Sequence, residues 1–476
     1  MSTQIPTTHS DAAGDAAAAV EAHLAANRDA RMEDYRAFLR IPSISALPSH
    51  APDSRRAAEW LAGRLTAAGL EHVAVEETGG NPVVYGDWLH AADGAPTVIV
   101  YGHYDVQPVD PLDLWESPPF EPIVRGNRIQ ARGASDDKGQ IMIHVAALDA
   151  LMATRHGAPV NLRYVFEGEE ESGSVHLDGW LEANRARLAA DLAVISDTGF
   201  FDGNRPAITV GLRGLVAGQI DVVGPSGDLH SGGFGGTVEN PIHALATIIA
   251  ALKRADGRVL VPGFYDDVKP LTEADHDAFA RLPFDEDAYL AETGSPMLHG
   301  EPDFTTLERR GGRPTIEING IWGGFEGDGF KTIIPSHAHA KISCRLVVDQ
   351  KPERVLNLVR DYILRIAPPT VRVDVRSFGG GLPSLTPIDH PATRAAARAL
   401  EATFGAEPLY IREGGSIPVA ASFEGILGLP VVLLGFTPSD EHAHAPNEYM
   451  DLRNYETAIR TVIRFFDELR DLPRRT

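Results

Sequence analysis

Hydrophobic and polar positions alternate between helical and strand-like spacing from about Arg28 to Pro206. Apolar residues recur with helical spacing in Ser54–Ala68, and Pro96–Tyr101 is a short β-branched run of the kind found in buried strands. Three further segments continue the alternation as helix, strand and strand: Lys138–Ala153, Val160–Phe166 and Asp191–Ser196. This pattern is typical of an α/β sheet covered by helices.

The same pattern returns after about Pro387, with a helix, a strand and a terminal helix predicted at Ala392–Thr403, Pro430–Leu434 and Asn454–Leu469. The intervening region has a different order. Its predicted segments run strand, helix, strand, strand, helix, strand: Leu215–Val223, Pro241–Leu252, Thr315–Asn319, His339–Val348, Glu353–Ile366 and Val371–Arg376. This β-α-β-β-α-β order is the ferredoxin-like arrangement.

We therefore predict an α/β protein of two domains. Residues 1–211 and 385–476 form a domain with a mixed sheet, and residues 212–384 form an inserted ferredoxin-like domain. Within these bounds we expect a loose tail over residues 1–15 and an irregular excursion over Val261–Gly312, which is rich in acidic residues, Pro and Gly.

Charge and composition narrow the possible partners. The chain has 476 residues, of which 43% are hydrophobic, so it can bury large cores. Its net charge of −23 argues against binding to nucleic acid or to an anionic membrane surface. No apolar run is long enough for a membrane helix, and the first residues make a poor signal peptide, so we expect a cytoplasmic protein.

Cys344 is the one cysteine of the chain. A single cysteine excludes a disulfide within the chain and a thiolate-rich zinc site, so a metal would need His, Asp and Glu ligands.

His103 and Asp105 directly follow the predicted strand Pro96–Tyr101. In extended backbone they point to one side, and Asp105 could accept the second ring proton of a metal-binding His103. The plain alternative is a surface His and Asp in a loop.

Two acidic segments also lie beside predicted elements. Asp136 and Asp137 precede a helix, where they could cap it, or Asp136 could bridge two metals. Glu167–Gly173 places four glutamates after a strand, which is either a solvated acidic loop or a cation site. There Glu171 could bind metal while Glu170 acts as a general base.

Asp197 follows another predicted strand, and Glu441–Glu448 carries two histidines, His442 and His444. Each segment alone favours an ordinary loop. Together they supply two imidazoles and three ligating carboxylates without thiolate, a donor set suited to Zn²⁺ or Mn²⁺. Two metals that share Asp136 would lie about 3.5–4 Å apart, close enough to activate a water together.

Eight strings in this order resemble the M20 metallopeptidases, and among them the carnosinase-like, cytosolic nonspecific dipeptidases: HYDVQP, ASDDKGQ, EGEEESGS, ISD, DLHSGGFGG, KTIIP, REGGSIP and HAPNE. The resemblance runs from about Arg28 to Leu472. It implies a hydrolase that cleaves the peptide bond of dipeptides with water activated by two divalent metals and a glutamate base. The implied metal is Zn²⁺, with Mn²⁺ as the alternative.

The resemblance also implies a role for each matching residue. His103 and Asp197 would complete one metal site, Glu171 and His444 the other, and Asp136 would bridge them. The H-x-x-N-E string selects His444 over His442. Glu170 would be the general base, and Asp105 would orient His103.

On the substrate side, the resemblance implies that His230 stabilises the oxyanion, and that His230 and Thr332 reach the active site of a neighbouring subunit. The inserted domain would then be a lid and a dimerisation domain of a homodimer. Arg345 would bind the substrate carboxylate, and Glu413 and Ser416 would complete the pocket. Turn, surface and capping roles are the plain alternatives for these residues.

Two other functions remain open from the sequence. The same scaffold could cleave an N-acyl or N-succinyl amino acid, because the metal core acts only on the carbonyl. A metal- or peptide-binding protein without catalysis belongs to a different class.

Overall fold

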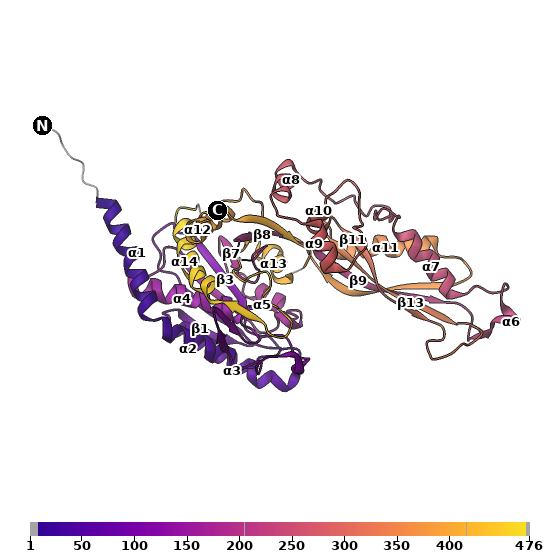
Figure 1. Ribbon diagram of the computed structural model, residues 1–476, viewed down its shortest axis with the longest axis horizontal. Coiled ribbons are helices and arrows are strands. Elements are labelled where there is room, and N and C mark those ends of the chain that lie inside the picture. Colours follow the sequence, from indigo (N-terminus) through magenta and orange to yellow (C-terminus); the bar gives the residue numbers. More distant parts are fainter. Residues whose placement is uncertain (1–7, 204, 416, 473–476) are drawn as a thin grey trace. The chain divides into compact units, whose positions relative to one another are not determined.

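The computed structural model describes residues 8–203, 205–415 and 417–472, and the chain forms two compact units (Figure 1). The first unit comprises Met1–Val210, Thr386–Tyr410 and Ser422–Thr476. The second comprises Gly211–Leu385 and Ile411–Ala421. The short segment Ile411–Ala421 therefore groups with the second unit, although in the sequence it lies between two segments of the first unit.

The helices and helical turns of the first unit are α1 (Thr8–Ala26), α2 (Arg28–Leu39), η1 (Pro48–His50), α3 (Ala51–Ala67), η2 (Leu112–Leu114), α4 (Lys138–Arg155), η3 (Glu170–Ser172), α5 (Leu177–Ala183), α12 (Pro391–Phe404), η4 (Phe423–Leu427) and α14 (Leu452–Leu469). Its strands are β1 (Glu71–Glu76), β2 (Val83–Trp88), β3 (Thr97–His103), β4 (Ile123–Arg125), β5 (Arg128–Gln130), β6 (Asn161–Glu167), β7 (Leu192–Ile195), β17 (Val431–Leu433) and β18 (Tyr449–Asp451). The chain passes between the units within β8 (Ala207–Leu212) and β16 (Leu409–Glu413).

A nine-stranded mixed sheet organises these elements. Its path is β1-β2-β6-β3-β7-β17-β8-β15, with β15 spanning Ser384–Leu385 and β16 pairing with β8 off this path. The central strand β3 runs parallel to both β6 and β7. Their carboxyl ends therefore meet at one edge, which is where ligands bind in sheets of this kind.

Both faces of the central strands are buried, which explains their continuous hydrophobic runs. Val98 and Val100 of β3 face the large core that α4, α12 and α14 cover, and α4 packs directly on α14. Ile99 and Tyr101 point to the opposite face, where the Tyr101 ring meets Phe423 edge-on at 5.6 Å. The ends of these strands are thus held by packing from two sides.

The second unit has an antiparallel sheet of its own. Its strands are β9 (Gly214–Val223), β10 (Leu229–His230), β11 (Thr315–Gly323), β12 (Ile333–Ile334), β13 (His337–Leu346) and β14 (Arg372–Gly381). Its helices are α6 (Ser231–Phe234), α7 (Pro241–Leu252), α8 (Glu273–Ala280), α9 (Glu286–Thr293), α10 (Thr306–Gly312), α11 (Pro352–Ile366) and α13 (Pro418–Ser422). The main sheet has the order β11-β13-β9-β14, and α7 and α11 pack on one of its faces.

Two sequence expectations are wrong. Residues 8–15, part of the expected loose tail, belong to helix α1, because the alanine-rich segment has high helix propensity. Residues 1–7 lie outside the described part of the chain. The expected irregular excursion Val261–Gly312 contains the three short helices α8, α9 and α10. Capping boxes open two of them, at Thr272 and at Thr305.

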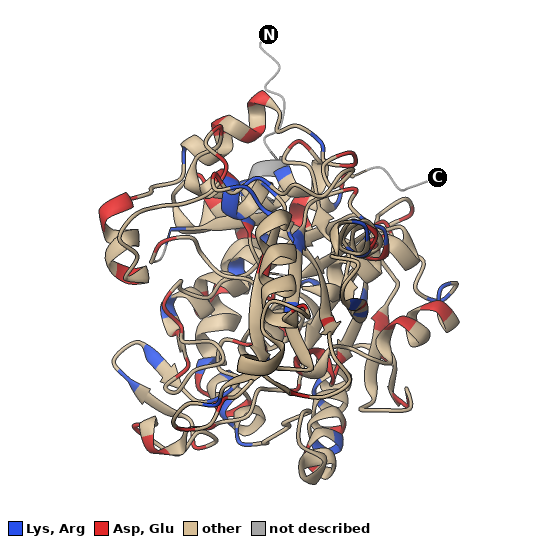
Figure 2. Ribbon diagram, turned by 90° about the vertical axis from the view of Figure 1, so that its right-hand side faces the viewer, with Lys and Arg blue, Asp and Glu red and all other residues tan. Residues whose placement is uncertain are grey.

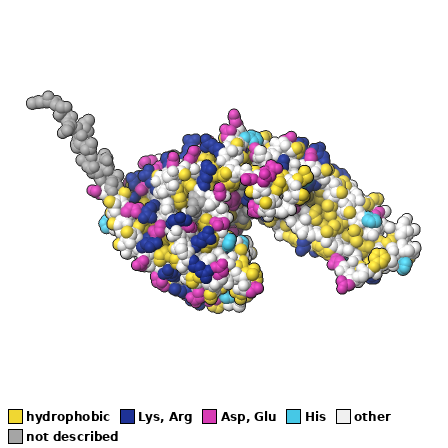
Figure 3. Space-filling view, in the orientation of Figure 1, with side chains coloured by type: hydrophobic (Ala, Val, Ile, Leu, Met, Phe, Trp, Pro, Cys, Tyr) yellow, Lys and Arg dark blue, Asp and Glu magenta, His cyan; other side chains and the backbone are white. Residues whose placement is uncertain are grey.

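Lys and Arg positions alternate with Asp and Glu positions over many parts of the ribbon (Figure 2). Hydrophobic side chains reach the surface of the second unit (Figure 3). In this unit the exposed fractions are 90% for Phe330 and 57% for Ile321. None of the described helices is both long and apolar enough to cross a membrane.

Candidate metal centre

Three adjacent parallel strands bring most of the candidate metal ligands together. His103 is the last residue of β3, Asp197 lies just beyond β7, and Glu171 lies in the turn η3 after β6. Asp136 comes from the segment before α4, and His444 from the loop before β18. All five residues belong to the first unit.

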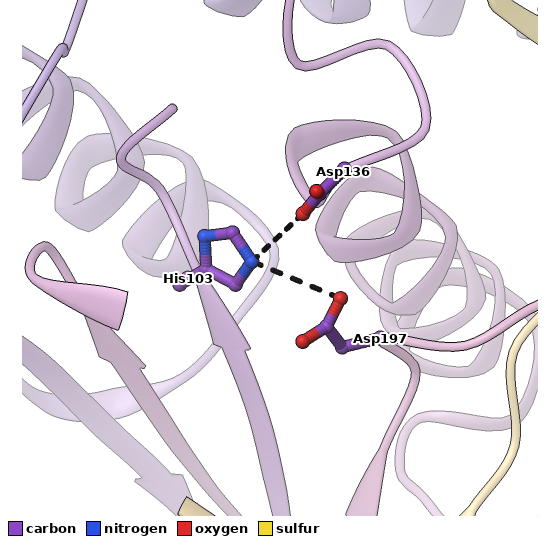
Figure 4. A group of neighbouring side chains, drawn as sticks. All are labelled: His103, Asp136 and Asp197. Atoms are coloured by element: carbon purple, nitrogen blue, oxygen red, sulfur yellow. Dashed lines mark ion pairs between the residues drawn. The ribbon is translucent and has the colours of Figure 1, made fainter. Parts of the chain in front are cut away.

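His103, Asp136 and Asp197 form the first group (Figure 4). The Nε2 atom of His103 lies 3.0 Å from Oδ1 of Asp136 and 3.8 Å from Oδ1 of Asp197. The imidazole edge points at both carboxylates in Figure 4, and His103 is fully buried. One ligand atom from each residue lies within 4.8 Å of the others, as a shared cation requires.

Asp136, Glu171 and His444 form the second group. The Nε2 atom of His444 lies 2.9 Å from Oδ2 of Asp136 and 3.2 Å from Oε2 of Glu171. Asp136 is therefore common to both groups and faces each one with a different oxygen. His442, the other histidine of this loop, instead packs its ring edge-on against Tyr449.

The donor atoms of these groups fit divalent cations. Nε2 of His103 and Oδ1 of Asp136 are buried and have no hydrogen-bond partner within the described part of the chain, although they face each other at 3.0 Å. Buried polar atoms are normally satisfied, so an orphaned pair in a ligand cluster points to a missing partner. Two imidazoles and three carboxylates, without thiolate, suit zinc or manganese.

The pKa values of the cluster also indicate an excess of negative charge that a cation would neutralise. Burial raises the pKa of Asp197 and of Glu171, and burial raises that of Glu170 to about 9, with repulsion from neighbouring carboxylates adding to each shift. Asp136 and Glu171 raise the pKa of His444 to about 10. The carboxylates thus draw protons, and divalent cations would supply the positive charge in their place.

Asp105 connects the residues around the first group. Burial would lower the pKa of His103, but three surrounding carboxylates, Asp105 among them, raise it well above its ordinary value. The two oxygens of Asp105 accept the backbone N–H groups of Glu170 at 3.3 Å and Glu171 at 3.1 Å. Nδ1 of His103 lies 3.2 Å from the backbone carbonyl oxygen of Asp105 and 3.4 Å from one of its carboxylate oxygens. Asp105 therefore fixes the turn η3 as well as the imidazole.

Asp137 differs from its neighbour Asp136. Its Oδ2 accepts the backbone N–H of His103 at 3.1 Å, and the residue is buried, so it supports the end of β3 from inside. The peptide bond between Asp136 and Asp137 is cis.

Two supporting residues were not assigned a role from the sequence. Gln107 donates from Nε2 to Oε2 of Glu171 at 2.7 Å. Glu448 is fully buried and accepts the backbone N–H of Asp136 at 3.1 Å. A Gln or Glu in a polar loop has no periodicity that signals burial. The HAPNE string was the available signal for Glu448.

The candidate substrate residues belong to the second unit. His230 and Thr332 are neighbours, because β10 pairs with β12 and Ser231 donates its backbone N–H to the Thr332 carbonyl at 3.0 Å. The exposed His230 accepts the Gly232 N–H at its Nδ1 at 3.0 Å.

Arg345 lies on β13 in register with Leu215 and Thr315. Alternation along β13 places it on the sheet face opposite α7 and α11, because the flanking residues Cys344 and Leu346 belong to the helix-covered core. The Glu413 carbonyl accepts the N–H of Arg213 at 3.3 Å. Ser416 lies outside the described residues.

The family profile of peptidase family M20/M25/M40 matches residues 99–468. The chain belongs to this family. It is 34% identical to the Cys-Gly metallodipeptidase dug1 of Schizosaccharomyces pombe over 445 residues, 90% of this chain and 93% of that protein. It is 33% identical to the human Beta-Ala-His dipeptidase over 381 residues, 79% of this chain and 75% of that protein.

A solved structure of the M20 metallo-carboxypeptidase Sso-CP2 from Sulfolobus solfataricus superposes with a TM-score of 0.82 and 32% identity, covering 93% of this chain and 99% of that one. The family resemblance seen in the sequence motifs, including its carnosinase-like branch, is thereby confirmed. The α/β fold with a large mixed sheet is confirmed as well.

Proposed function

We propose that the protein is a metal-dependent dipeptidase with two divalent cations per subunit. The observation that carries this proposal is the pair of three-residue groups that share Asp136. Each group offers one imidazole and one further carboxylate to its own cation. The dipeptidase relatives, which align over most of this chain, support a dipeptide as substrate.

His103 and Asp197 would hold one cation, Glu171 and His444 the other, and Asp136 both. We assign zinc, with manganese as the alternative, because the donors are nitrogen and oxygen only. When bound, the two cations acidify a water molecule and polarise the scissile carbonyl.

Glu170 is the general base in this proposal. Its carboxylate is mostly buried beside both groups, and its backbone N–H is held by Asp105 at 3.3 Å. Glu170 takes a proton from the attacking water and returns it to the amine that leaves. The carbonyl and carboxylate oxygens of Asp105 keep Nδ1 of His103 protonated, which leaves Nε2 with its lone pair directed at the metal position.

We assign residues 1–211 and 385–476 to the catalytic domain and residues 212–384 to a ferredoxin-like lid and dimerisation domain. The strand and helix order of the second unit supports the ferredoxin-like assignment. Arg345 of the inserted domain binds the substrate carboxylate, and Glu413 and Ser416, which follow this domain in the sequence, complete the pocket. Cys344 is buried, and a lone cysteine forms no disulfide within the chain, which fits a cytoplasmic enzyme.

The proposed homodimer places His230 and Thr332 of one subunit at the neighbour's active site. Mixing two inactive variants, Glu170→Gln and His230→Ala, tests this arrangement. In the mixed dimer one site has an intact Glu170 and receives an intact His230, so activity returns on mixing. Inactivity of the verified mixed dimer would contradict the crossover.

The proposed reaction is tested with a panel of Cys-Gly, β-Ala-His, tripeptides and N-acetyl or N-succinyl amino acids. We expect hydrolysis of dipeptides, its loss after exhaustive chelation, and its return with Zn²⁺ or Mn²⁺. Full dipeptide hydrolysis without metal, or turnover of the acylated amino acids alone, would contradict the proposal.

A further inference from the structure

Glu448 connects the two loops that carry Asp136 and His444. Its side chain is fully buried. Its carboxylate accepts five hydrogen bonds from the segment before α4: from Arg132 Nη1 (2.7 Å), Gly133 N (3.0 Å), Ser135 N (2.9 Å), Ser135 Oγ (3.1 Å) and Asp136 N (3.1 Å). Four of these five bonds are donated by Gly133, Ser135 and Asp136.

The distribution of the bonds fixes the orientation of the carboxylate. One oxygen, Oε2, is occupied by Arg132 and Gly133, while Oε1 faces Ser135 and Asp136. Arg132 is itself 1% exposed, so the ion pair is shielded from water. Charge-assisted hydrogen bonds of this kind are strong and directional. A shift of Glu448 would therefore move the backbone at Asp136.

The loop that carries His444 is anchored by the side chain of Asn447. The Asn447 side chain donates to the Leu114 carbonyl at 3.0 Å and accepts the Glu116 N–H at 2.8 Å. His444 and Asn447 have positive φ values of 60° and 66°, an uncommon conformation that needs support from its surroundings. Glu448 provides the anchor at the end of this loop nearest Asp136.

We propose that Glu448 is a positioning residue that fixes the bridging carboxylate of Asp136 relative to His444, so that both cations are held together. This inference rests on the proposed di-metal centre. Glu448 does not touch the substrate or the reacting atoms in this account. It acts through the N–H of Asp136 and the loop of His444.

The test is Glu448→Gln, with binding of Mn²⁺ measured by titration and the spin coupling of the Mn²⁺ pair measured by EPR. The amide nitrogen of Gln would face the donors of Arg132 or Ser135, so the loop must shift. We expect affinity for the Mn²⁺ pair to fall about 10- to 100-fold, with loss of the coupled signal. Wild-type affinity and coupling in this variant would overturn the proposal.

A matched control separates positioning from general stability. Glu456 accepts two hydrogen bonds from the buried Arg31, at 3.2 and 3.0 Å, in the same unit. Glu456→Gln alters an ion pair between helices α14 and α2 that includes none of the five proposed ligands. We expect a lower Tm with unchanged Mn²⁺ binding and coupling. Equal loss of binding in both variants would also overturn the positioning role.

Ser135→Ala decides the question if Glu448→Gln does not fold, because it deletes one of the five bonds without removing charge. We expect it to fold and to bind the Mn²⁺ pair several-fold more weakly. Binding and coupling equal to wild type would overturn the proposal. Failure of the di-metal centre itself is recognised separately, since the wild-type protein would then bind no coupled pair.

Discussion

The Nε2 atom of His444 lies 2.9 Å from Oδ2 of Asp136. The other oxygen of the same carboxylate lies 3.0 Å from Nε2 of His103. The carboxylate of Asp136 thus lies beside two imidazoles, His103 and His444, that are far apart in the sequence. Neighbouring imidazoles lower the pKa of Asp136 against the effect of its burial, so it is ionised as a bridge requires.

Asp136→Asn should therefore impair both proposed metal sites. The amide keeps one acceptor oxygen and replaces the other with a donor, which cannot bind a cation. We expect fewer than two metal ions per chain by elemental analysis and hydrolysis at the level of the chelated protein. Asp149→Asn is the control, because Asp149 lies on helix α4 and pairs with Arg64 of helix α3, and neither residue belongs to a ligand group. Two tightly bound ions in Asp136→Asn would contradict the shared ligand.

Glu170→Gln should separate metal binding from turnover. Glu170 belongs to neither ligand group, so metal content should stay at the wild-type value. Loss of the base should lower kcat about 10²- to 10⁴-fold with little change in KM. Glu169→Gln serves as the control, since Glu169 pairs with His176. A kcat within a few-fold of wild type would remove Glu170 from the reaction.

Asp105→Asn should weaken metal binding although Asp105 is not a ligand. The amide nitrogen would oppose the N–H of Glu170 or Glu171. Nδ1 of His103 would lose the negative charge beside it, while the Asp105 carbonyl would still accept its N–H. We expect about 10- to 100-fold lower metal affinity by chelator competition. Unchanged affinity would show that the turn η3 and His103 are positioned by other contacts.

Much of the site was predictable because its ligands follow strong hydrophobic runs. Val98–Val100 is buried on both faces, so the strand could be located from the sequence, although β3 continues past the predicted end at Tyr101 to His103. The turn that carries Glu171 and the position of Asp197 follow from β6 and β7 in the same way. Parallel pairing of adjacent strands then places their carboxyl ends together.

Asp105 was assigned from the sequence as the partner of His103, but the contacts that Asp105 and Glu448 make with distant backbone groups were not predictable, because the sequence does not locate those groups. Asp105 accepts two N–H groups from a turn more than sixty residues later, and Glu448 buries its charge against Arg132. No pattern of hydrophobic residues in the sequence signals either contact. The short helices α8 and α10 did have a signal, since Thr272 and Thr305 each precede an acidic residue at the capping-box spacing.

Stability should fall in mild acid because of His144. This residue is buried with Nε2 2.7 Å from the hydroxyl of Ser196, and burial lowers its pKa to about 3. Its unfolded-state pKa is about 6.5, so the unfolded chain binds more protons between these values. The contribution of neutral His144 to the free energy of unfolding is therefore complete above pH about 6.5, and it declines as the pH falls through this window.

We expect His144 to cost about 1 kcal/mol of unfolding free energy between pH about 7 and about 5.5. Urea titrations of metal-free wild-type protein and His144→Gln isolate this contribution, because both share the remaining titrating groups. The difference between the two proteins should change by that amount across the window. A difference that is constant with pH would exclude a neutral, buried His144.

An anomalous-scattering map of hydrolytically active crystals loaded with Zn²⁺ or Mn²⁺ tests the central claim most directly. We predict two peaks, one bounded by His103, Asp136 and Asp197 and the other by Asp136, Glu171 and His444. The absence of peaks between these side chains in an active crystal would contradict the account.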